Sequence, residues 1–396
     1  MRDKPYCNAP WLGLAYEATK GCQPCCEWKK ETFWGTYEEY VKSDYLKNFK
    51  KMMYSDKPNS GCIECTHNEK IGGYSRRHYY EKWDNDVDLE APGLDRIIRL
   101  DYRAGNKCNM MCRMCGPQSS SLLEDEVVAA GEEEKGFIKH LDTSDVYDLD
   151  LNNCIEISIL GGEPSIDLKV RKFMNYVADN YPNIEVVVTT NATNASDKWF
   201  KTLMRFCTGS GLRVILSVDA AGETQDFQRS GGDWNKIKKN IQKYKEISDS
   251  SEYNCGVSIQ LTASALNMTT LDKWWDELLR IGIKVDINQV WWPKGMSISA
   301  MPDEYKKQSI KFLEDWLQEI INPMILDKEI EEHWKFSALD LKEHKIDAAE
   351  SAIRILKGTE YSAHAQKEFV ALQNRYDNYR SEDVRDLDDR FKVMMI

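Results

Sequence analysis

Short apolar runs alternate with amphipathic segments through the middle of the chain, from Leu94 to about residue 292. The runs are rich in Val, Ile, Leu and Thr, and they have the length of buried strands. We expect six strands, at residues 96–102, 155–160, 184–189, 212–218, 256–262 and 284–290.

The segments between these runs carry apolar residues at the spacing of amphipathic helices. We expect helices at residues 168–179, 197–207, 233–247 and 270–281, with Asp197 and Asp233 as N-caps. Strands that alternate with helices are typical of βα units and a parallel sheet. The predicted fold class is therefore α/β.

The two flanks of this pattern differ from it. Residues 1–92 are rich in cysteine and aromatic residues and predict a small domain organised around a metal, with Pro92 and Gly93 at its end. The βα pattern fills residues 93–295. Residues 296–396 predict a C-terminal helical extension, whose first helix has an apolar stripe of Ile310, Leu313, Leu317, Ile320 and Ile321.

Composition narrows the classes of partner. The 396 residues have a net charge of -12, which disfavours a nucleic-acid partner. No apolar run approaches the length of a membrane span, and the N-terminus lacks the apolar region of a secretory signal. We expect a cytoplasmic protein whose twelve cysteines bind metal instead of forming disulfides.

Three cysteines form a compact metal-binding pattern, C-x3-C-x2-C, at Cys108, Cys112 and Cys115. Three thiolates in one loop can hold three irons of a [4Fe-4S] cluster and leave the fourth iron open to a substrate or cofactor. Structural zinc would require a fourth nitrogen or sulfur ligand, which this loop lacks. A Leu-Gly-Gly-Glu-Pro run, residues 160–164, follows the second predicted strand.

These two motifs resemble those of the radical S-adenosylmethionine (SAM) superfamily. The resemblance implies a partial (β/α)6 TIM-like barrel, with its site at the carboxyl ends of the strands. It also implies that the open iron binds SAM, and that SAM is reductively cleaved to methionine and a 5'-deoxyadenosyl radical that abstracts hydrogen from a substrate.

The same resemblance implies a set of SAM contacts. The Gly-Gly-Glu motif holds the methionyl amino group, polar side chains after the fourth strand reach the ribose, and an arginine pairs with the carboxylate. The predicted residues are Met114, Gly161, Gly162, Glu163, Asn191, Ser217, Asp219 and Arg229. Ala192 stands where the family commonly has glycine, so the backbone freedom of glycine is lost there. No residue is predicted as a hydrogen donor or general base.

Six further cysteines, at positions 7, 22, 25, 26, 62 and 65, lie in the N-terminal segment. Their pattern resembles a twitch domain, which is half of a SPASM domain and binds one auxiliary [4Fe-4S] cluster. The predicted ligands are Cys7, Cys25, Cys26, Cys62 and Cys65; which of Cys22, Cys25 and Cys26 binds is open. The auxiliary cluster would serve electron transfer or substrate binding.

The resemblance implies two partners, a reductant such as flavodoxin or ferredoxin and a peptide or protein substrate. Two alternatives are open. One is a dehydrogenase of the same superfamily that acts on a small molecule. The other is a binding or scaffold protein without turnover, in which the pairs Cys22-x2-Cys25 and Cys62-x2-Cys65 hold zinc.

Overall fold

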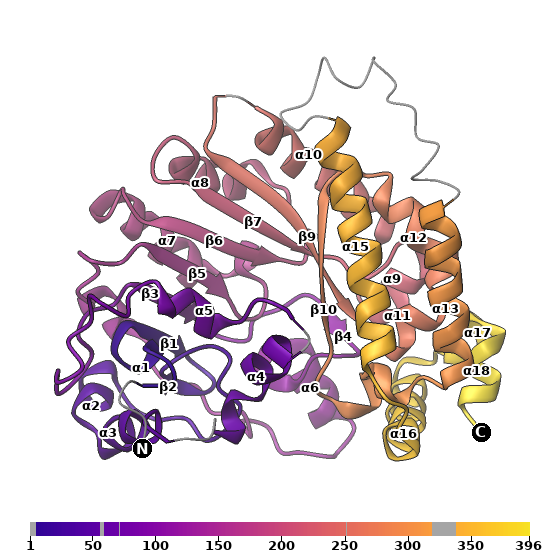
Figure 1. Ribbon diagram of the computed structural model, residues 1–396, viewed down its shortest axis with the longest axis horizontal. Coiled ribbons are helices and arrows are strands. Elements are labelled where there is room, and N and C mark those ends of the chain that lie inside the picture. The colour runs from indigo at the N-terminus through magenta and orange to yellow at the C-terminus, as the bar shows by residue number, and fades with distance from the viewer. Residues whose placement is uncertain (1–4, 56–58, 71, 251, 319–337) are drawn as a thin grey trace. The chain divides into compact units, whose positions relative to one another are not determined.

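The computed structural model describes residues 5–55, 59–70, 72–250, 252–318 and 338–396 (Figure 1). The chain divides into two compact units. The first comprises Met1–Lys107, Gly136–Val188 and Lys201–Leu212, and the second comprises Cys108–Lys135, Thr189–Phe200 and Arg213–Ile396. Parallel strands joined by helices dominate the sheet in each unit, which confirms the α/β class.

The sheet of the first unit has the strand order β6-β5-β3-β1-β2. All its pairs are parallel except β1 with β2. The strands are β1 (Gly13–Glu17), β2 (Gly21–Gln23), β3 (Arg99–Arg103), β5 (Glu156–Leu160) and β6 (Glu185–Thr190). Sequence patterns predicted β3, β5 and β6 but missed β1, because this strand is short, buried throughout and poor in β-branched residues.

The helices of the first unit are α1 (Ala9–Leu12), α2 (Tyr37–Lys42), α3 (Asp44–Met52), α4 (Ile63–Lys70), α5 (Arg76–Glu81) and α7 (Leu168–Asn180). In α7, Val170, Phe173 and Val177 are buried at helical spacing, and Asp167 caps the first turn by accepting the Lys169 N–H. This helix confirms the prediction for 168–179. Helix α8 (Asp197–Cys207) has the predicted bounds, but the prediction of Asp197 as its N-cap is wrong, because Asp197 is its first residue and the Phe200 N–H donates to the Ser196 carbonyl.

An apolar cluster that includes Trp11, Trp28, Phe49 and Tyr80 fills the N-terminal segment. The segment therefore has a core of its own as well as its cysteines, in contrast to the expectation of a domain organised by metal alone. Aromatic residues bury large apolar areas even in short segments. The prediction missed this core because it relied on long periodic helices and strands. The domain bounds inferred from the sequence stay a prediction.

The strands of the second unit are β7 (Leu212–Ser217), β9 (Cys255–Ala263) and β10 (Lys284–Gln289), in the order β10-β9-β7, and all three were predicted. A two-stranded antiparallel ladder joins β4 (Met111–Cys112) to β8 (Arg229–Ser230). Neither of these short strands was predicted, since two residues carry no periodicity.

The helices of the second unit, apart from α8, are α6 (Ser121–Ala129), α9 (Gly222–Gln228), α10 (Trp234–Asp249), α11 (Ala265–Thr269), α12 (Leu271–Leu279), α13 (Asp303–Trp316), α15 (Ala338–Gly358), α16 (Ala363–Arg380), α17 (Val384–Leu387) and α18 (Asp389–Met394). As predicted, Asp233 caps α10 by accepting the Lys236 N–H. Helices α13 to α18 confirm a helical C-terminal extension, and α15 runs along β10 (Figure 1). Leu313 of the predicted stripe is buried, whereas Ile320 and Ile321 lie outside the described residues.

The ranges described above contain no helix that is both long enough and apolar enough to cross a membrane.

Candidate functional site

The loop with Cys108, Cys112 and Cys115 lies at the start of the second unit. The Cys108 N–H donates to Ser121 Oγ at 3.2 Å, and Ser120 Oγ donates to the Met110 carbonyl at 2.6 Å, so the first turn of α6 holds the loop backbone. Cys112 lies in β4 and is buried, while the other two cysteines are partly exposed. We refer to residues 108–115 as the cluster loop.

A buried ion pair lies against the cluster loop. Arg229 Nε donates to Asp219 Oδ2 at 2.5 Å, and Arg229 Nη1 lies 3.9 Å from Cys112 Sγ. The other oxygen of Asp219 accepts the Thr262 N–H at 2.8 Å. A hydrogen bond with Cys115 and the Arg229 charge lower the pKa of Cys112. The same hydrogen bond, together with burial, raises the pKa of Cys115. The Arg229 charge therefore favours the thiolate at Cys112, which is the form that binds metal.

Breaking the buried Asp219 to Arg229 pair is expected to destabilise the fold strongly. Asp219→Asn removes the negative charge and leaves Arg229, only 9% exposed, without its carboxylate. We expect the free energy of unfolding to fall by about 3–5 kcal/mol, as for other broken buried pairs. Urea unfolding under anaerobic conditions measures this. As a control, Asp315→Asn breaks an exposed pair with Lys311 and should cost about 1 kcal/mol or less. Equal effects of the two variants would contradict the expectation.

Asn191, a predicted SAM contact, meets the cluster loop. Its Nδ2 donates to Asn109 Oδ1 at 3.0 Å, and Asn109 Nδ2 donates to Thr193 Oγ1 at 2.9 Å. The next residue, Ala192, has a φ of 59°. This alanine therefore adopts the left-handed conformation that favours glycine, so the backbone keeps that geometry without it.

Met114 and Ser217, two further predicted contacts, lie in the same unit. Gln228 Nε2 lies 4.0 Å from Met114 Sδ, and the Gln228 carbonyl accepts the Arg113 N–H at 2.9 Å. Ser217 is the last residue of β7 and is partly exposed. Their roles toward SAM stay predictions.

The Gly-Gly-Glu motif lies in the first unit, after β5. The Glu163 N–H donates to the carbonyl of Lys107 at 2.7 Å, and Lys107 directly precedes Cys108 in the chain. Gly161 has a φ of 93°, and a Cβ on Gly162 would lie 2.1 Å from the Lys107 oxygen. The two glycines therefore permit a backbone approach that any side chain would block. Glu163 is buried and accepts the Ser165 N–H at 3.0 Å.

Replacing Gly162 with alanine tests this close approach. The added Cβ meets backbone atoms, which cannot rotate away, so the segment at Lys107 must move. We expect the Kd for SAM to rise about tenfold or more, since displacements near 1 Å have effects of that scale. Isothermal titration calorimetry of the anaerobically reconstituted protein measures the Kd. Gly358→Ala, where a Cβ meets no atom within 4 Å, is the control. An unchanged Kd in Gly162→Ala would refute the argument.

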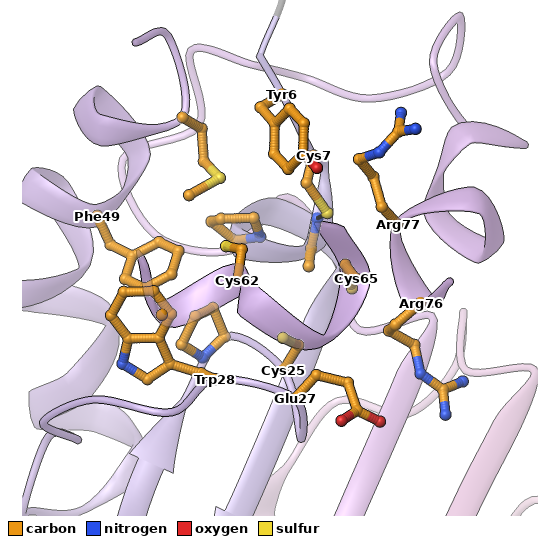
Figure 2. Close-up of a pocket in the computed structure, with 15 residues that line it drawn as sticks. Tyr6, Cys7, Cys25, Glu27, Trp28, Phe49, Cys62, Cys65, Arg76 and Arg77 are labelled. Carbon is orange, nitrogen blue, oxygen red and sulfur yellow. Dashed lines mark hydrogen bonds between the residues drawn. The ribbon is translucent and has the colours of Figure 1, made fainter. Parts of the chain in front are cut away.

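A second candidate site is a cavity in the first unit whose lining includes Cys7, Cys25, Cys62 and Cys65. Figure 2 shows these cysteines between aromatic side chains, Trp28 and Phe49, and basic ones, Arg76 and Arg77. The cysteines come from separate local elements: the segment before α1, the turn after β2, the short 3-10 helix Ser60–Cys62, and α4. The fold thus gathers residues that are up to 58 positions apart (65 − 7).

Cys22 and Cys26 do not line this cavity. The Cys22 thiol is buried on β2 and donates to the Gly35 carbonyl at 3.8 Å. The Cys26 side chain interacts with Asp101 of β3. Of these three neighbouring cysteines, Cys25 lines the cavity, a distinction that spacing alone left open.

The donor set of the cavity suits an iron-sulfur group. Burial raises the pKa of Cys7 to about 12, and the Ala9 N–H donates to Cys7 Sγ at 3.4 Å. Buried thiols of this kind ionise when a metal replaces their protons. Arg76 Nε is buried without a hydrogen-bond partner among the described residues. Across those residues, no three His, Cys, Asp or Glu side chains converge on a single metal ion.

Comparison with known proteins agrees with the geometry of the cluster loop. Residues 102–262 match the family model of the Radical SAM superfamily. This range is a radical SAM domain. The matched range contains the cluster loop, the Gly-Gly-Glu motif, Asp219 and Arg229. The radical SAM resemblance drawn from the motifs is thereby confirmed, and a search of curated proteins returns no significant match.

Solved structures of radical SAM enzymes resemble the chain over much of its length. Native anSMEcpe with bound AdoMet is 19% identical with a TM-score of 0.41, and the match covers 57% of this chain and 61% of that one. Streptococcus suis SuiB bound to S-adenosylmethionine is 14% identical with a TM-score of 0.35, and the match covers 78% and 68%. SuiB bound to precursor peptide SuiA is 13% identical with a TM-score of 0.35, covering 71% and 58%. The chain thus spans less than two thirds of the first structure.

Proposed function

We propose that the radical SAM domain reductively cleaves SAM at a [4Fe-4S] cluster held by Cys108, Cys112 and Cys115. The observation that carries this proposal is the buried Arg229 beside Cys112 in a loop with three cysteines. Three thiolates leave one iron for a non-protein ligand. When bound, the cluster and SAM supply a 5'-deoxyadenosyl radical that abstracts hydrogen from the substrate.

The surrounding residues have separate roles in this proposal. Glycines 161 and 162 let the motif lie against the backbone at Lys107, and Glu163 offers a carboxylate to the amino group of SAM. Arg229 is oriented by Asp219, and its positive charge offsets the negative charge of the thiolates and of the SAM carboxylate. Asn191 acts on the loop through the hydrogen bond that it donates to the Asn109 side chain. Ser217 and Met114 complete the proposed SAM contacts.

We further propose that Cys7, Cys25, Cys62 and Cys65 hold one auxiliary [4Fe-4S] cluster. The support is the shared cavity and its four sulfur donors. Four protein thiolates would occupy all four irons, so this cluster would transfer electrons or stabilise the fold and would not bind substrate. Cys26 is left out of this ligand set because it does not line the cavity.

The proposed substrate is a peptide or protein, and the proposed electron donor is a flavodoxin or ferredoxin. This choice rests on the resemblance of the N-terminal cysteine pattern to a twitch domain, whose relatives often modify peptides. Oxidation of a small molecule is the alternative outcome. Mass spectrometry of peptides encoded beside the gene, after incubation with reduced enzyme and SAM, separates the two.

The proposed reaction is tested with the anaerobically reconstituted protein. After reduction with dithionite, SAM should give 5'-deoxyadenosine and methionine, quantified by liquid chromatography with mass spectrometry. Iron and zinc are measured in the same sample. Zinc without iron, together with no SAM cleavage, would replace this proposal with the zinc scaffold.

A further inference from the structure

Arg113 lies in the cluster loop between two of its cysteines and is completely buried. A buried arginine is rare and requires partners for its charge and its N–H groups. Neither the SAM site nor the auxiliary site proposed above uses this residue. Its partners instead belong to the C-terminal extension and to α9.

The guanidinium group of Arg113 is enclosed on several sides. Nη1 donates to Gln373 Oε1 at 2.7 Å, and Nε donates to the Phe227 carbonyl at 3.2 Å. Nη2 pairs with Asp377 Oδ1 at 2.8 Å and with the carboxylate of Glu382. The guanidinium carbon lies 3.8 Å from the centroid of the Phe227 ring. A planar fork with hydrogen bonds at its edges and an aromatic face beside it fixes position and orientation together.

A second arginine, Arg380, connects the end of α16 to the elements that flank the loop. It forms a bidentate pair with Glu126 of α6, at 2.7 and 2.9 Å, and donates to Ser230 Oγ at 3.0 Å. Ser230 pairs with Met111 in the β4-β8 ladder. Helix α16 and the turn after it therefore hold the cluster loop through Arg113. Through Arg380, α16 also holds α6 and β8, the two elements that flank the loop.

These contacts link residues up to 269 positions apart in the sequence, as for Arg113 and Glu382. A surface loop does not require such an anchor, because its backbone can bond to water. A loop that positions three metal ligands does benefit from such an anchor, because small displacements of the ligands alter the properties of the bound metal group.

We infer that the C-terminal extension positions the cluster loop through Arg113, which is clamped by Gln373, Asp377 and Glu382. The inference rests on the proposed function and assigns the extension a role that the sequence did not reveal. Arg113 is a positioning residue, since it acts through Cys112 and Cys115 and has no assigned contact with SAM.

The test compares Arg113→Gln, Arg113→Lys and Glu382→Gln with wild type and with Arg375→Gln. Arg375 is the matched control, because it lies on α16 and pairs with the partly exposed Glu132 but forms no ion pair with the clamp residues. One readout is the change that SAM causes in the electron paramagnetic resonance spectrum of the reduced protein. The other is the rate of 5'-deoxyadenosine formation.

We expect Arg113→Gln to alter the SAM-dependent spectrum and to lower the rate by about tenfold to a hundredfold. Lysine keeps the charge but not the fork, so its rate should be intermediate. Glu382 is partly exposed, so Glu382→Gln decides the question if Arg113→Gln does not fold. The inference is overturned if Arg113→Gln folds and keeps the wild-type spectrum and rate. If Arg113→Gln does not fold, a wild-type spectrum and rate in Glu382→Gln overturn it. Equal losses of rate in the control Arg375→Gln would also overturn it.

The two proposals fail in distinguishable ways. If wild type forms no 5'-deoxyadenosine, the proposed function fails, while the cluster spectrum still reports whether Arg113 positions the loop. If wild type cleaves SAM and the clamp variants match it, only the role of the C-terminal extension is wrong.

Discussion

Replacing Cys112 with alanine is expected to reduce SAM cleavage to background. The substitution removes a thiolate from the cluster loop and also the sulfur 3.9 Å from Arg229 Nη1. Two remaining thiolates cannot hold the three-ligand cluster on which SAM binding depends. We expect 5'-deoxyadenosine formation to fall by about a thousandfold or more, the scale seen when an essential group is removed.

The control for this prediction is Cys207→Ala. Cys207 is buried in α8, where its thiol donates to the Leu203 carbonyl at 3.7 Å, and no metal role is proposed for it. The control should retain SAM cleavage close to the wild-type rate. Cleavage by Cys112→Ala within tenfold of wild type would remove the basis for a cluster at this loop, whatever the control does.

Replacing Cys25 with alanine is expected to halve the iron content of the reconstituted protein. Two [4Fe-4S] clusters contribute about eight iron atoms per chain, so loss of one leaves about four. Cys25 is the cavity-lining member of its group of three cysteines, and no other thiol in the lining lies near it in sequence. Iron and sulfide assays measure the loss, and Mössbauer spectra identify the remaining cluster.

The neighbouring cysteines are matched controls for the auxiliary cluster. Cys22→Ser and Cys26→Ser change thiols that lie outside the cavity, so both variants should keep about eight irons. If Cys26→Ser loses iron and Cys25→Ala retains it, Cys26 and not Cys25 would be the ligand. A zinc site would be established if each variant of Cys7, Cys25, Cys62 and Cys65 lost the same amount of zinc and no iron.

A cluster with four protein ligands has a functional consequence. Cys25→Ala should leave SAM cleavage at the cluster loop largely intact, because the three loop cysteines do not depend on the N-terminal cavity for their ligands. Turnover of the substrate would fall if the auxiliary cluster accepts an electron. The two measurements together separate generation of the radical from the later oxidation step.

Local sequence patterns predicted much of the fold because they depend on neighbouring residues. Strands such as β9 and helices such as α7 show their periodicity within a few residues. The position of Asp233 directly before α10 predicts the start of that helix. Strand β1 escaped prediction because it is recognisable chiefly by its parallel pairing with β3, about 85 residues later.

The sequence by itself determined that this chain has a radical SAM cysteine loop, a Gly-Gly-Glu motif and a cysteine-rich N-terminus, because each of these is a short-range pattern. Only the tertiary structure decided that Cys25, and not Cys22 or Cys26, joins the cavity, and that Arg113 meets the C-terminal extension. The physical reason is that side-chain direction and long-range contacts depend on how distant segments pack, which spacing along the chain does not encode.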